Sequence, residues 1–229
     1  MESNLPVLRI SGLEKVVETT AGKLTILKGI DLEIKRSATV AIVGESGSGK
    51  TTLLSLMAGL DTCTAGQIFL GPYELTSLDE EKRARVRAEM VAFVFQSFQL
   101  LASLTALENV MLPAELKGHD LAEEEAMQLL ERVGLAARAH HYPRQLSGGE
   151  QQRVAIARAF ASTAQVLFAD EPTGNLDTRT GSHIIDLIFD LNRESGTTLV
   201  LVTHDARLAA RCDQTVCLEA GRLVDSGDL

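Results

Sequence analysis

The sequence has few of the residues that mark several common classes of protein. Its three cysteines, Cys63, Cys212 and Cys217, form no Cys-x-x-Cys pair, which argues against a disulfide framework and for reduced thiols in a cytosol. Only 22 residues are Lys or Arg against 31 Asp or Glu, and the net charge of −9 disfavours a nucleic-acid partner. No apolar run approaches the roughly 20 residues that cross a bilayer. A role at a membrane would therefore require another chain.

The beginning of the sequence, MESNLPVLRI, lacks the basic and apolar regions of a signal peptide. The sequence contains neither an internal repeat, nor a low-complexity segment, nor an Asn-Lys-x-Asp guanine motif. With 229 residues, 45% of them apolar and 23% charged, the composition is that of an ordinary globular domain. We therefore expect a single domain over residues 1–229, with room for one subdomain.

Short apolar runs between turn residues alternate with helical patterns over much of the chain. We expect strands within 7–17, 24–34, 38–44, 166–171 and 198–204, and a hairpin at 216–227. Helices are expected at 51–60, 147–161, 183–193 and 205–211. Strands that alternate with helices favour an α/β fold with a mostly parallel sheet.

A helical block interrupts this alternation in the middle of the chain. Residues 79–90 predict a charged, exposed helix. Thr105 with Glu108, and Asp120 with Glu123, each match the spacing of a capping box. Helical spacing also predicts one buried face formed by Ala126, Leu129, Leu130 and Val133. We therefore expect an inserted helical subdomain at approximately 97–160.

The stretch GESGSGKT, from Gly44 to Thr51, fits the phosphate-loop pattern G-x-x-x-x-G-K-[ST]. It lies between a predicted buried strand and a predicted helix, as this loop requires. Its glycines let main-chain N–H groups approach phosphate oxygens, and the helix adds the positive end of its dipole. Lys50 can then reach the β- and γ-phosphates, and the Thr51 hydroxyl can bind Mg²⁺. The simpler alternative is a glycine-serine turn without a ligand.

Two predicted strands end in polar residues that suit phosphate chemistry. Asp170 and Glu171 lie at the carboxyl end of an apolar strand, at the edge where open α/β sheets bind ligands. Asp170 would hold Mg²⁺ through water, and Glu171 would polarise an attacking water molecule. His204 ends another strand, and Gln96 follows the apolar run AFVF. Taken alone, the acids are also explained as solvated strand caps and His204 as a structural residue.

A second glycine pair lies far from the phosphate loop, in the stretch LSGGEQQR. Ser147 and Glu150 have capping-box spacing, and Gly148 and Gly149 leave the N–H groups of the first helical turn unobstructed. Such a helix N-terminus suits an anion. For this stretch alone, a capped helix without a ligand is the better interpretation.

Together, these motifs resemble those of ABC ATPases, in the family's order and over nearly the whole chain. Leu146–Arg153 is similar to the family signature, Gly44–Thr51 to Walker A, and Val166–Glu171 to Walker B. Gln96 is similar to the Q-loop glutamine, Asn175–Asp177 to the D-loop, and His204 to the switch histidine. The resemblance implies a P-loop NTPase fold with an N-terminal antiparallel β subdomain, an inserted helical subdomain, and hydrolysis of ATP with Mg²⁺.

The resemblance also implies that two copies of the chain meet head to tail and enclose two ATP molecules. Glu171, His204, Lys50 and Gln96 would then be catalytic, and Thr51, Gln96 and Asp170 would hold Mg²⁺. The signature residues of one copy would face the ATP held by the other copy. The implied nucleotide contacts are Val17, Gly44, Glu45, Ser46, Gly47, Ser48, Gly49, Lys50, Thr51, Thr52, Ser147, Gly148, Gly149, Glu150 and Asp177.

One residue departs from the family's pattern. Family members usually carry an aromatic residue in the first hairpin that stacks on adenine, and Val17 occupies that place here. The two tyrosines, Tyr73 and Tyr142, lie elsewhere. A lost stacking partner costs about 1 kcal/mol. We therefore expect weaker selectivity for adenine, with an apolar contact from Val16 or Val17.

Three stretches resemble a narrower branch, the lipoprotein-releasing and macrolide-exporting ATPases: Phe93–Leu101, Leu104–Val110 and Ala169–Asp177. This implies a peripheral protein on the cytoplasmic face of a bacterial inner membrane. Its partner would be a transmembrane permease with a large extracytoplasmic domain, contacted by residues 98–110. Ordinary core packing is the alternative interpretation of that segment.

A related branch leaves a second function open. The cell-division ATPase resembles the same group, so the chain is alternatively a regulatory ATPase that signals across the membrane to an extracytoplasmic hydrolase and moves no solute. A soluble ATPase of DNA repair or translation fits poorly, because 229 residues leave no room for a long coiled coil or a second cassette. A small GTPase or a kinase does not explain Leu146–Gln151.

Overall fold

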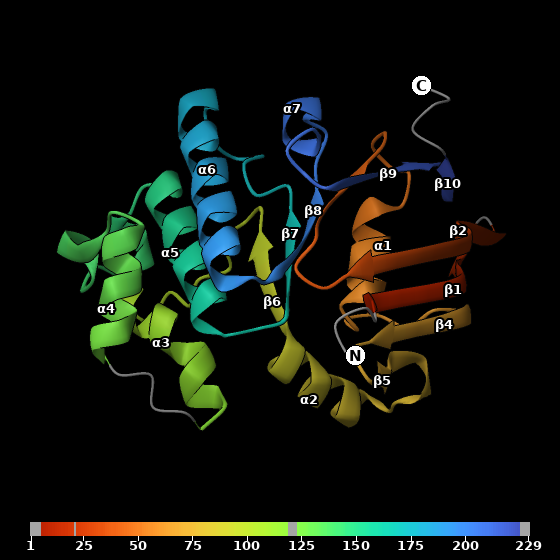
Figure 1. Ribbon diagram of the computed structural model, residues 1–229, viewed down its shortest axis with the longest axis horizontal. Coiled ribbons are helices and arrows are strands. Elements are labelled where there is room, and N and C mark those ends of the chain that lie inside the picture. The colour runs from red at the N-terminus through yellow and green to blue at the C-terminus, as the bar shows by residue number, and fades with distance from the viewer. Residues whose placement is uncertain (1–5, 21, 119–122, 225–229) are drawn as a thin grey trace. The chain divides into compact units, whose positions relative to one another are not determined.

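The computed structural model describes residues 6–20, 22–118 and 123–224 of the 229-residue chain. The chain divides into two compact units, whose helices and strands are labelled in Figure 1. Residues 1–87 and 197–229 form the first, here the P-loop unit. Residues 88–196 form the second, here the signature unit.

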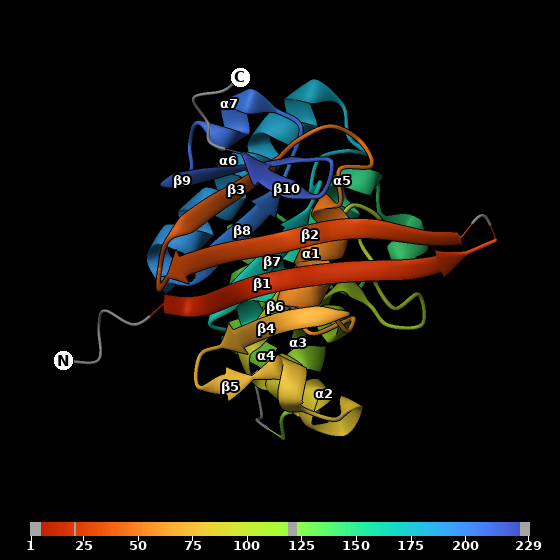
Figure 2. The same ribbon diagram turned by 90° about the vertical axis from the view of Figure 1, so that its right-hand side faces the viewer.

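An antiparallel sheet of order β2-β1-β4-β5 belongs to the P-loop unit. Its strands are β1 (Pro6–Thr19), β2 (Gly22–Lys35), β4 (Ala65–Leu70) and β5 (Tyr73–Glu74). The long hairpin of β1 and β2 is plain in Figure 2 and extends beyond the expected strands. Gly12 and Gly29 have positive φ of 56° and 70° where the register shifts, so pairing continues through both positions.

Three parallel strands form the core of the same unit. Strand β3 (Thr39–Val43) pairs in parallel with β8 (Thr198–Val202) and with β9 (Gln214–Glu219). Helix α1 (Lys50–Met57) follows the phosphate loop, and α7 (Ala206–Ala209) follows β8. Strand β10 (Arg222–Val224) pairs antiparallel with β9, which confirms the described part of the expected hairpin. The apolar runs predicted these strands because side chains of parallel strands are buried on both faces.

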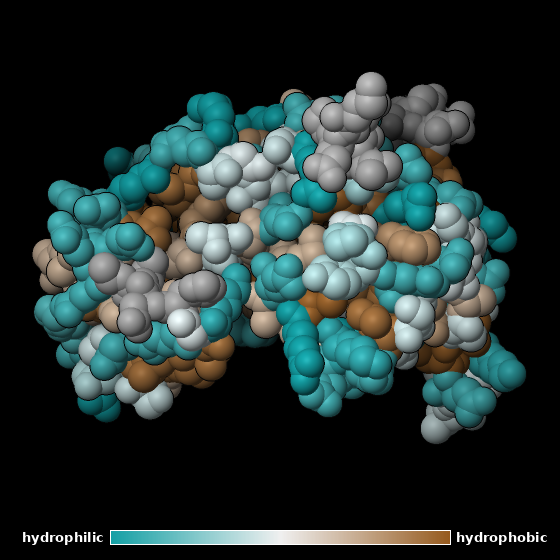
Figure 3. All heavy atoms as spheres, turned by 60° about the horizontal axis from the view of Figure 1, so that its bottom comes forward, coloured by the Kyte–Doolittle hydropathy of each residue, from teal (hydrophilic) through white to brown (hydrophobic). Residues whose placement is uncertain are grey.

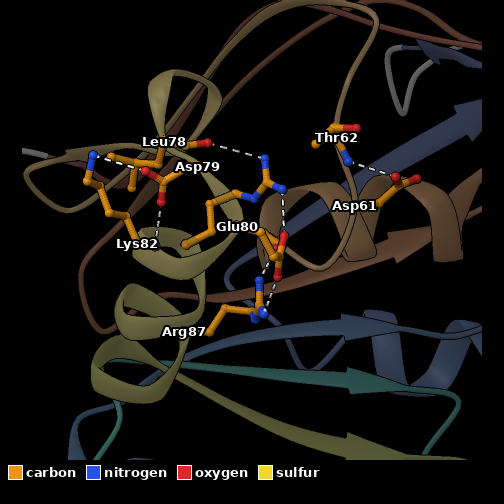
Figure 4. Close-up of polar contacts among 9 residues, drawn as sticks. Asp61, Thr62, Leu78, Asp79, Glu80, Lys82 and Arg87 are labelled. Carbon is orange, nitrogen blue, oxygen red and sulfur yellow. Dashed lines mark hydrogen bonds and ion pairs between the residues drawn. The ribbon is translucent and has the colours of Figure 1, made fainter.

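Ion pairs surround the start of α2 (Glu80–Met90), which follows a short 3₁₀ helix at Leu75–Ser77. Glu80 Oε2 lies 2.6 Å from Arg83 Nη2, and its Oε1 lies 2.8 Å from Arg87 Nη2 (Figure 4). Arg87 also donates to the Gly59 carbonyl at 2.5 Å, just after α1. The charged helix was therefore predicted correctly, and its arginines attach it to the end of α1.

Within its described residues, the signature unit combines two parallel strands with several helices. Strand β6 (Val91–Phe95) pairs in parallel with β7 (Val166–Asp170). Helix α5 (Gly148–Ala161) packs against α3 (Ala106–Leu116), α4 (Glu123–Arg132) and α6 (Thr178–Ser195). Short 3₁₀ turns at Ala136–Arg138 and Pro143–Gln145 lead from α4 to α5. Helix α6 begins five residues earlier than expected, because Asp177 caps it.

The capping and burial expected in the helical block are largely confirmed. Thr105 and Glu108 form a capping box on α3, whereas the capping residue Asp120 lies outside the described residues. Ala126, Leu130 and Val133 are buried, and Leu129 is half-buried. Helices α3, α4 and α5 lie within the expected subdomain, whose limits at approximately 97–160 stay a prediction.

The surface is mainly hydrophilic on the face that Figure 3 shows, with hydrophobic side chains gathered in separate patches. Leu24, Leu60, Leu101 and Leu116 are exposed, and Leu116 on α3 exposes 79% of its surface. Among the described residues, no helix has the length and apolar character that crossing a bilayer requires.

Candidate functional site

The loop between β3 and α1 has the backbone that a phosphate cradle requires. Gly44, Gly47 and Gly49 have positive φ of 146°, 81° and 106°, which favour glycine. A Cβ at Gly44 would lie 2.1 Å from the Leu218 carbonyl oxygen, whereas a Cβ at Gly47 would meet nothing within 4 Å. The loop is therefore packed against the protein at its start and open at its tip.

Side chains of the same loop supply polar groups. Lys50 Nζ donates to the carbonyl oxygens of Gly44 at 2.9 Å and Glu45 at 2.7 Å, so its ammonium lies over the loop. The Ser48 Oγ is buried without a hydrogen-bond partner in the described part of the chain. Thr51 is exposed on the first turn of α1. An orphaned hydroxyl, a lysine and an open glycine tip together fit a bound phosphate group.

The first hairpin places an apolar pair where the resemblance implies an adenine contact. Val17 pairs directly with Leu24 across β1 and β2, so the two side chains share one face of the sheet. Val17 is half-buried, and Leu24 exposes 54% of its surface. The sequence predicted a contact from Val16 or Val17 but not one from Leu24, because only the hairpin register identifies Leu24.

His204 lies in the P-loop unit, two residues beyond the end of β8, and its side chain is exposed. The next residue, Asp205, caps α7 by accepting from the Arg207 N–H at 2.8 Å. The Arg207 side chain also hydrogen-bonds this carboxylate and holds the pKa of Asp205 below its ordinary value. His204 is thus followed at once by an ionised carboxylate on a capped turn.

Asp170 and Glu171 lie in the signature unit, where Asp170 is the last residue of β7. Glu171 has a positive φ of 46°, in the left-handed region that residues other than glycine seldom adopt. The Gly174 N–H donates to the Glu171 carbonyl at 2.9 Å. The Gln152 amide donates to the Pro172 carbonyl at 2.7 Å. Hydrogen bonds on both carbonyls therefore hold the turn that carries Glu171.

Gln96 follows β6 directly and is joined to the D-loop. Its Nε2 donates to Asn175 Oδ1 at 3.3 Å, and Asn175 Nδ2 donates to the Gln96 carbonyl at 2.9 Å. Gly174 makes room for this contact, because a Cβ there would lie 2.6 Å from Gln96 Nε2. Gln96, Glu171 and the D-loop are therefore connected within one unit.

The N-terminus of α5 has the predicted capping box. Ser147 is the N-cap residue, its hydroxyl accepts from the Glu150 N–H at 3.4 Å, and the Glu150 carboxylate accepts from the Ser147 N–H at 2.8 Å. That N–H bond is the main reason why the pKa of Glu150 is lowered. A Cβ at Gly149 would lie 2.7 Å from Thr180 Cγ2 of α6. Gly149 therefore also allows α5 and α6 to pack closely, a role that the sequence did not reveal.

Asp177 caps α6 by accepting from the N–H groups of Arg179 and Thr180 at 3.1 and 3.0 Å. Thr180 also lowers the pKa of this carboxyl group by hydrogen bonding. The structure thus gives Asp177 a capping role, and its contact with nucleotide stays a prediction.

The segment after Gln96 contains a strained turn. Phe98 and Gln99 have consecutive positive φ values of 60° and 49°. Arg158 of α5 donates to the carbonyls of Phe98 at 3.1 Å and Gln99 at 2.7 Å. The Phe98 ring lies over Gly148, where a Cβ would be 3.5 Å from it. The role of Arg158 was not predicted from the sequence, because it depends on contacts about 60 residues away along the chain.

A groove of about 280 Å³ opens on the signature unit. Side chains of β6, the end of α3 and the end of α5 line it, among them Phe93, Leu116 and Arg158. The lining is mainly apolar, and Lys117 at its edge donates to the Ser162 carbonyl at 2.5 Å. Such a groove suits an apolar helix or loop of another protein.

The two units divide the predicted site residues between them. The P-loop unit holds the hairpin residue, the phosphate loop with Thr52, and His204: Val17, Gly44, Glu45, Ser46, Gly47, Ser48, Gly49, Lys50, Thr51, Thr52 and His204. The signature unit holds Gln96, Ser147, Gly148, Gly149, Glu150, Asp170, Glu171 and Asp177. Within each unit, the local geometry is that of a phosphate-binding loop or of a capped helix N-terminus.

The phosphate loop, the parallel strands and the antiparallel hairpin define a P-loop NTPase fold of the ABC type. The chain belongs to the ABC transporter family, whose model matches residues 27–174. It is an ATP-binding and ATP-hydrolysing subunit of a transporter of this family. The α/β fold, the family and the ATPase activity expected from the sequence are therefore confirmed.

Two relatives match the chain almost from end to end. An "uncharacterized ABC transporter ATP-binding protein YbbA" of Escherichia coli (strain K12) is 55% identical over 219 residues, which cover 95% of this chain and 96% of that protein. The "lipoprotein-releasing system ATP-binding protein LolD" of Legionella pneumophila (strain Paris) is 47% identical with the same coverage. The expected similarity to lipoprotein-releasing ATPases is thus confirmed.

A solved structure has the same fold. It shows a dimer of the ATP-binding cassette MJ0796 in a post-hydrolysis state, bound to ADP and Pi. That cassette is 37% identical to this chain, with a TM-score of 0.87, and the match covers 95% of this chain and 97% of the other.

Proposed function

We propose that this chain drives a bacterial inner-membrane ABC transporter of the mechanotransmission type, in which ATP-dependent closure of two copies moves a separate transmembrane permease. The observation that carries the proposal is the presence of two anion-binding elements in one chain. One is the glycine loop with Lys50, and the other is the capped N-terminus of α5 at Ser147. One ATP occupies one phosphate loop, so a chain with both elements is suited to serve two ATP molecules.

The dimer that we propose is head to tail, as the resemblance implied. Ser147, Gly148 and Gly149 of one copy face the γ-phosphate of the ATP that the phosphate loop of the other copy holds. The dimeric MJ0796 cassette, at 37% identity, supports the formation of a homodimer. The N–H groups at the start of α5 and its dipole suit an anion at that position.

Within each site, we assign each residue its role by its chemistry. Lys50 neutralises the β- and γ-phosphates, Glu171 orients the attacking water, and His204 and the opposite signature meet charge on the γ-phosphoryl group. The Thr51 hydroxyl, the Gln96 amide oxygen and the Asp170 carboxylate are hard oxygen donors, which suit Mg²⁺. Bound Mg²⁺ would neutralise charge that develops on the phosphate oxygens. Hydrolysis opens the dimer and resets the permease.

The permease docks, in this proposal, on the groove of the signature unit. The groove is apolar, it contains the highly exposed Leu116, and the strained turn at Phe98 and Gln99 is bound to its lining residue Arg158. The similarity to LolD, an ATP-binding protein of a lipoprotein-releasing system, supports a membrane partner. We propose that this partner has a large extracytoplasmic domain and that the chain works on the cytoplasmic face of the inner membrane.

Purification of the tagged chain from detergent-solubilised membranes of its host tests the proposal. We expect a transmembrane protein with few membrane helices and a large extracytoplasmic domain to co-purify, as identified by mass spectrometry. Leu116→Glu should abolish co-purification while ATP binding survives. Leu60→Glu, an exposed leucine of the P-loop unit, is the matched control.

Two outcomes would contradict the proposal. Recovery of the chain without any membrane protein would argue against a permease. A membrane partner whose extracytoplasmic part binds a hydrolase and carries no cargo would instead support the regulatory ATPase.

A further inference from the structure

Gln152 is a fully buried polar residue in the helix that carries the signature. Its side chain exposes 0% of its surface, and the neighbouring Val154, Ala155 and Ile156 of α5 are also fully buried. A buried amide is costly unless it is hydrogen-bonded. In Gln152, Nε2 has a partner, and Oε1 has none in the described part of the chain. Because burying a half-satisfied amide is costly, we expect a structural role for its one hydrogen bond, which Nε2 donates to the Pro172 carbonyl.

That hydrogen bond ends beside Glu171. Gln152 Nε2 donates to the Pro172 carbonyl at 2.7 Å, across 20 residues of sequence. Glu171 has its positive φ of 46° immediately before this proline. A proline restricts its own φ and the conformation of the residue before it, so a shift of the Pro172 carbonyl is passed on to Glu171. The Gln152 amide therefore supports a strained backbone from a separate helix.

The N-terminal turn of α5 is packed on the same loop. Leu176 Cδ2 would lie 3.7 Å from a Cβ at Gly148, and Thr180 Cγ2 would lie 2.7 Å from a Cβ at Gly149. The signature glycines and the Gln152 amide thus contact successive parts of the segment from Pro172 to Thr180. A displacement of α5 therefore also displaces this segment, because close-packed interiors transmit strain.

We propose that Gln152 is a positioning residue that couples the signature helix to the Glu171 of its own chain. The inference rests on the proposed function, in which the signature serves one ATP and Glu171 of the same chain serves the other. Engagement of α5 with the first ATP then sets the position of the base at the second. The Gln152 amide gives the two composite sites a direct mechanical connection through each chain.

Mixed dimers separate the two contributions of a chain. Two copies with different affinity tags are co-expressed in the host. The solubilised membranes are purified through one tag and then through the other, so that only mixed pairs remain. One copy is native, so its signature engages the ATP of the other site, and the other copy carries Glu171→Gln and keeps its signature. This parent pair has one competent site, which uses Glu171 of the first copy and the signature of the second.

Gln152→Met is then added to either copy. Methionine has the length of glutamine and fills the space without a donor. We expect kcat to fall at least tenfold more when the substitution is in the copy that supplies Glu171 than when it is in the copy that supplies the signature. The expected fall is this large because misplacing a catalytic group by about 1 Å can lower the rate by about 100-fold. KM for ATP should change less than twofold.

The matched control is Gln151→Met, because the Gln151 amide donates to the Leu146 carbonyl at 3.0 Å and not to the Glu171 turn. Gln151→Met should change kcat by the same factor whichever copy carries it. Gln152→Asn, whose shorter amide falls short of Pro172, replaces Gln152→Met if that variant does not fold.

Equal losses in the two copies, or a larger loss in the copy that supplies the signature, would overturn the coupling role and leave the composite site intact. An active pair in which both copies carry Ser147→Arg would instead overturn the composite site, and the inference with it.

Discussion

Gln96 and Asn175 exchange two hydrogen bonds across 79 residues of sequence, one to a side chain and one to the main chain. Because Nε2 of Gln96 is turned to Asn175, Oε1 is the atom with which Gln96 can bind a cation. The exchange fixes that orientation and joins the end of β6 to the D-loop. In the proposed Mg²⁺ site, a shift of the Gln96 amide would therefore displace Asn175 and the loop that follows Glu171.

Glu171→Gln should trap an ATP-bound dimer. Glutamine keeps the shape of the side chain but cannot polarise the attacking water, so we expect kcat to fall by about 100-fold or more while ATP still binds. Size-exclusion chromatography with light scattering, in ATP and Mg²⁺, should show a stable dimer. A variant that hydrolyses ATP at the native rate would refute the role of Glu171.

Ser147→Arg should block closure while the phosphate loop still binds ATP. A long cation at the N-cap position obstructs the approach of a phosphate held by the other copy. Fluorescent-nucleotide titration should give native affinity, and scattering should show monomers in ATP. Because the lost cap itself costs about 1 kcal/mol, Ser147→Asn, which keeps a capping side chain, is the control. Loss of nucleotide binding in the monomer would count against the composite site.

The sequence predicted the elements of this fold well because local patterns determine them. The strands at β3, β7 and β8 are short apolar runs, and the capping boxes at Ser147 and Thr105 are spacings of three residues. Their chemistry is complete within a few neighbouring residues. Prediction from the sequence therefore succeeded at the phosphate loop and at the start of α5.

Contacts between distant segments could not be predicted in the same way. The Gln152 amide looks like any polar residue of a helix until its carbonyl partner at Pro172 is known. Leu24 lies beside Val17 only because of the register of the hairpin. The need for glycine at position 149 follows from its contact with Thr180, which depends on the packing of α6 against α5. These relationships depend on tertiary packing, which a single sequence does not display.

Val17→Tyr should strengthen and sharpen nucleotide binding. A ring at this position, directly opposite Leu24, restores a stacking surface for adenine, so we expect ATP affinity to rise about fivefold, which corresponds to about 1 kcal/mol. The preference for ATP over GTP should rise as well. Glu18→Tyr places the ring on the opposite face of the same strand and is the control. Unchanged affinity and unchanged preference in Val17→Tyr would show that the hairpin does not contact the base.

Glu108→Gln should make the thermal stability of the chain less dependent on pH at acidic pH. Hydrogen bonds from the Thr105 N–H at 2.7 Å and hydroxyl at 2.8 Å hold the pKa of Glu108 below its ordinary value of 4.5. A carboxyl group whose pKa is lower in the folded than in the unfolded state stabilises the fold at any pH above its unfolded pKa. This stabilisation is lost as the pH falls through the folded pKa. The difference in Tm between native chain and variant should therefore be constant above pH 4.5 and shrink below it.

The control for this pH dependence is Glu115→Gln, an exposed glutamate near the other end of α3. Its negative charge lies near the helix C-terminus, where protonation is not expected to destabilise the helix. A difference in Tm that widens in acid for Glu108→Gln would contradict the assignment.

Asn109→Ala should destabilise the signature unit by about 2–4 kcal/mol, because several buried polar groups lose their partner together. The Asn109 side chain exposes 0% of its surface. Its Nδ2 lies 3.1, 3.1 and 2.9 Å from the carbonyl oxygens of Leu101, Leu104 and Thr105, and its Oδ1 accepts from the Leu101 N–H at 2.9 Å. This one amide therefore organises the loop before α3.

Urea denaturation of the native chain, Asn109→Ala and Asn109→Leu measures the effect. Leucine has the same branching and the same number of side-chain heavy atoms as asparagine, so it removes the hydrogen bonds without leaving a cavity, and we expect both variants to lose most of the same free energy of unfolding. If Asn109→Leu were as stable as the native chain, packing rather than hydrogen bonding would hold residues 101–105. Permease binding by the folded Asn109→Leu variant then tells whether the order of this loop matters for docking, because residues 98–110 are the segment expected to contact the partner.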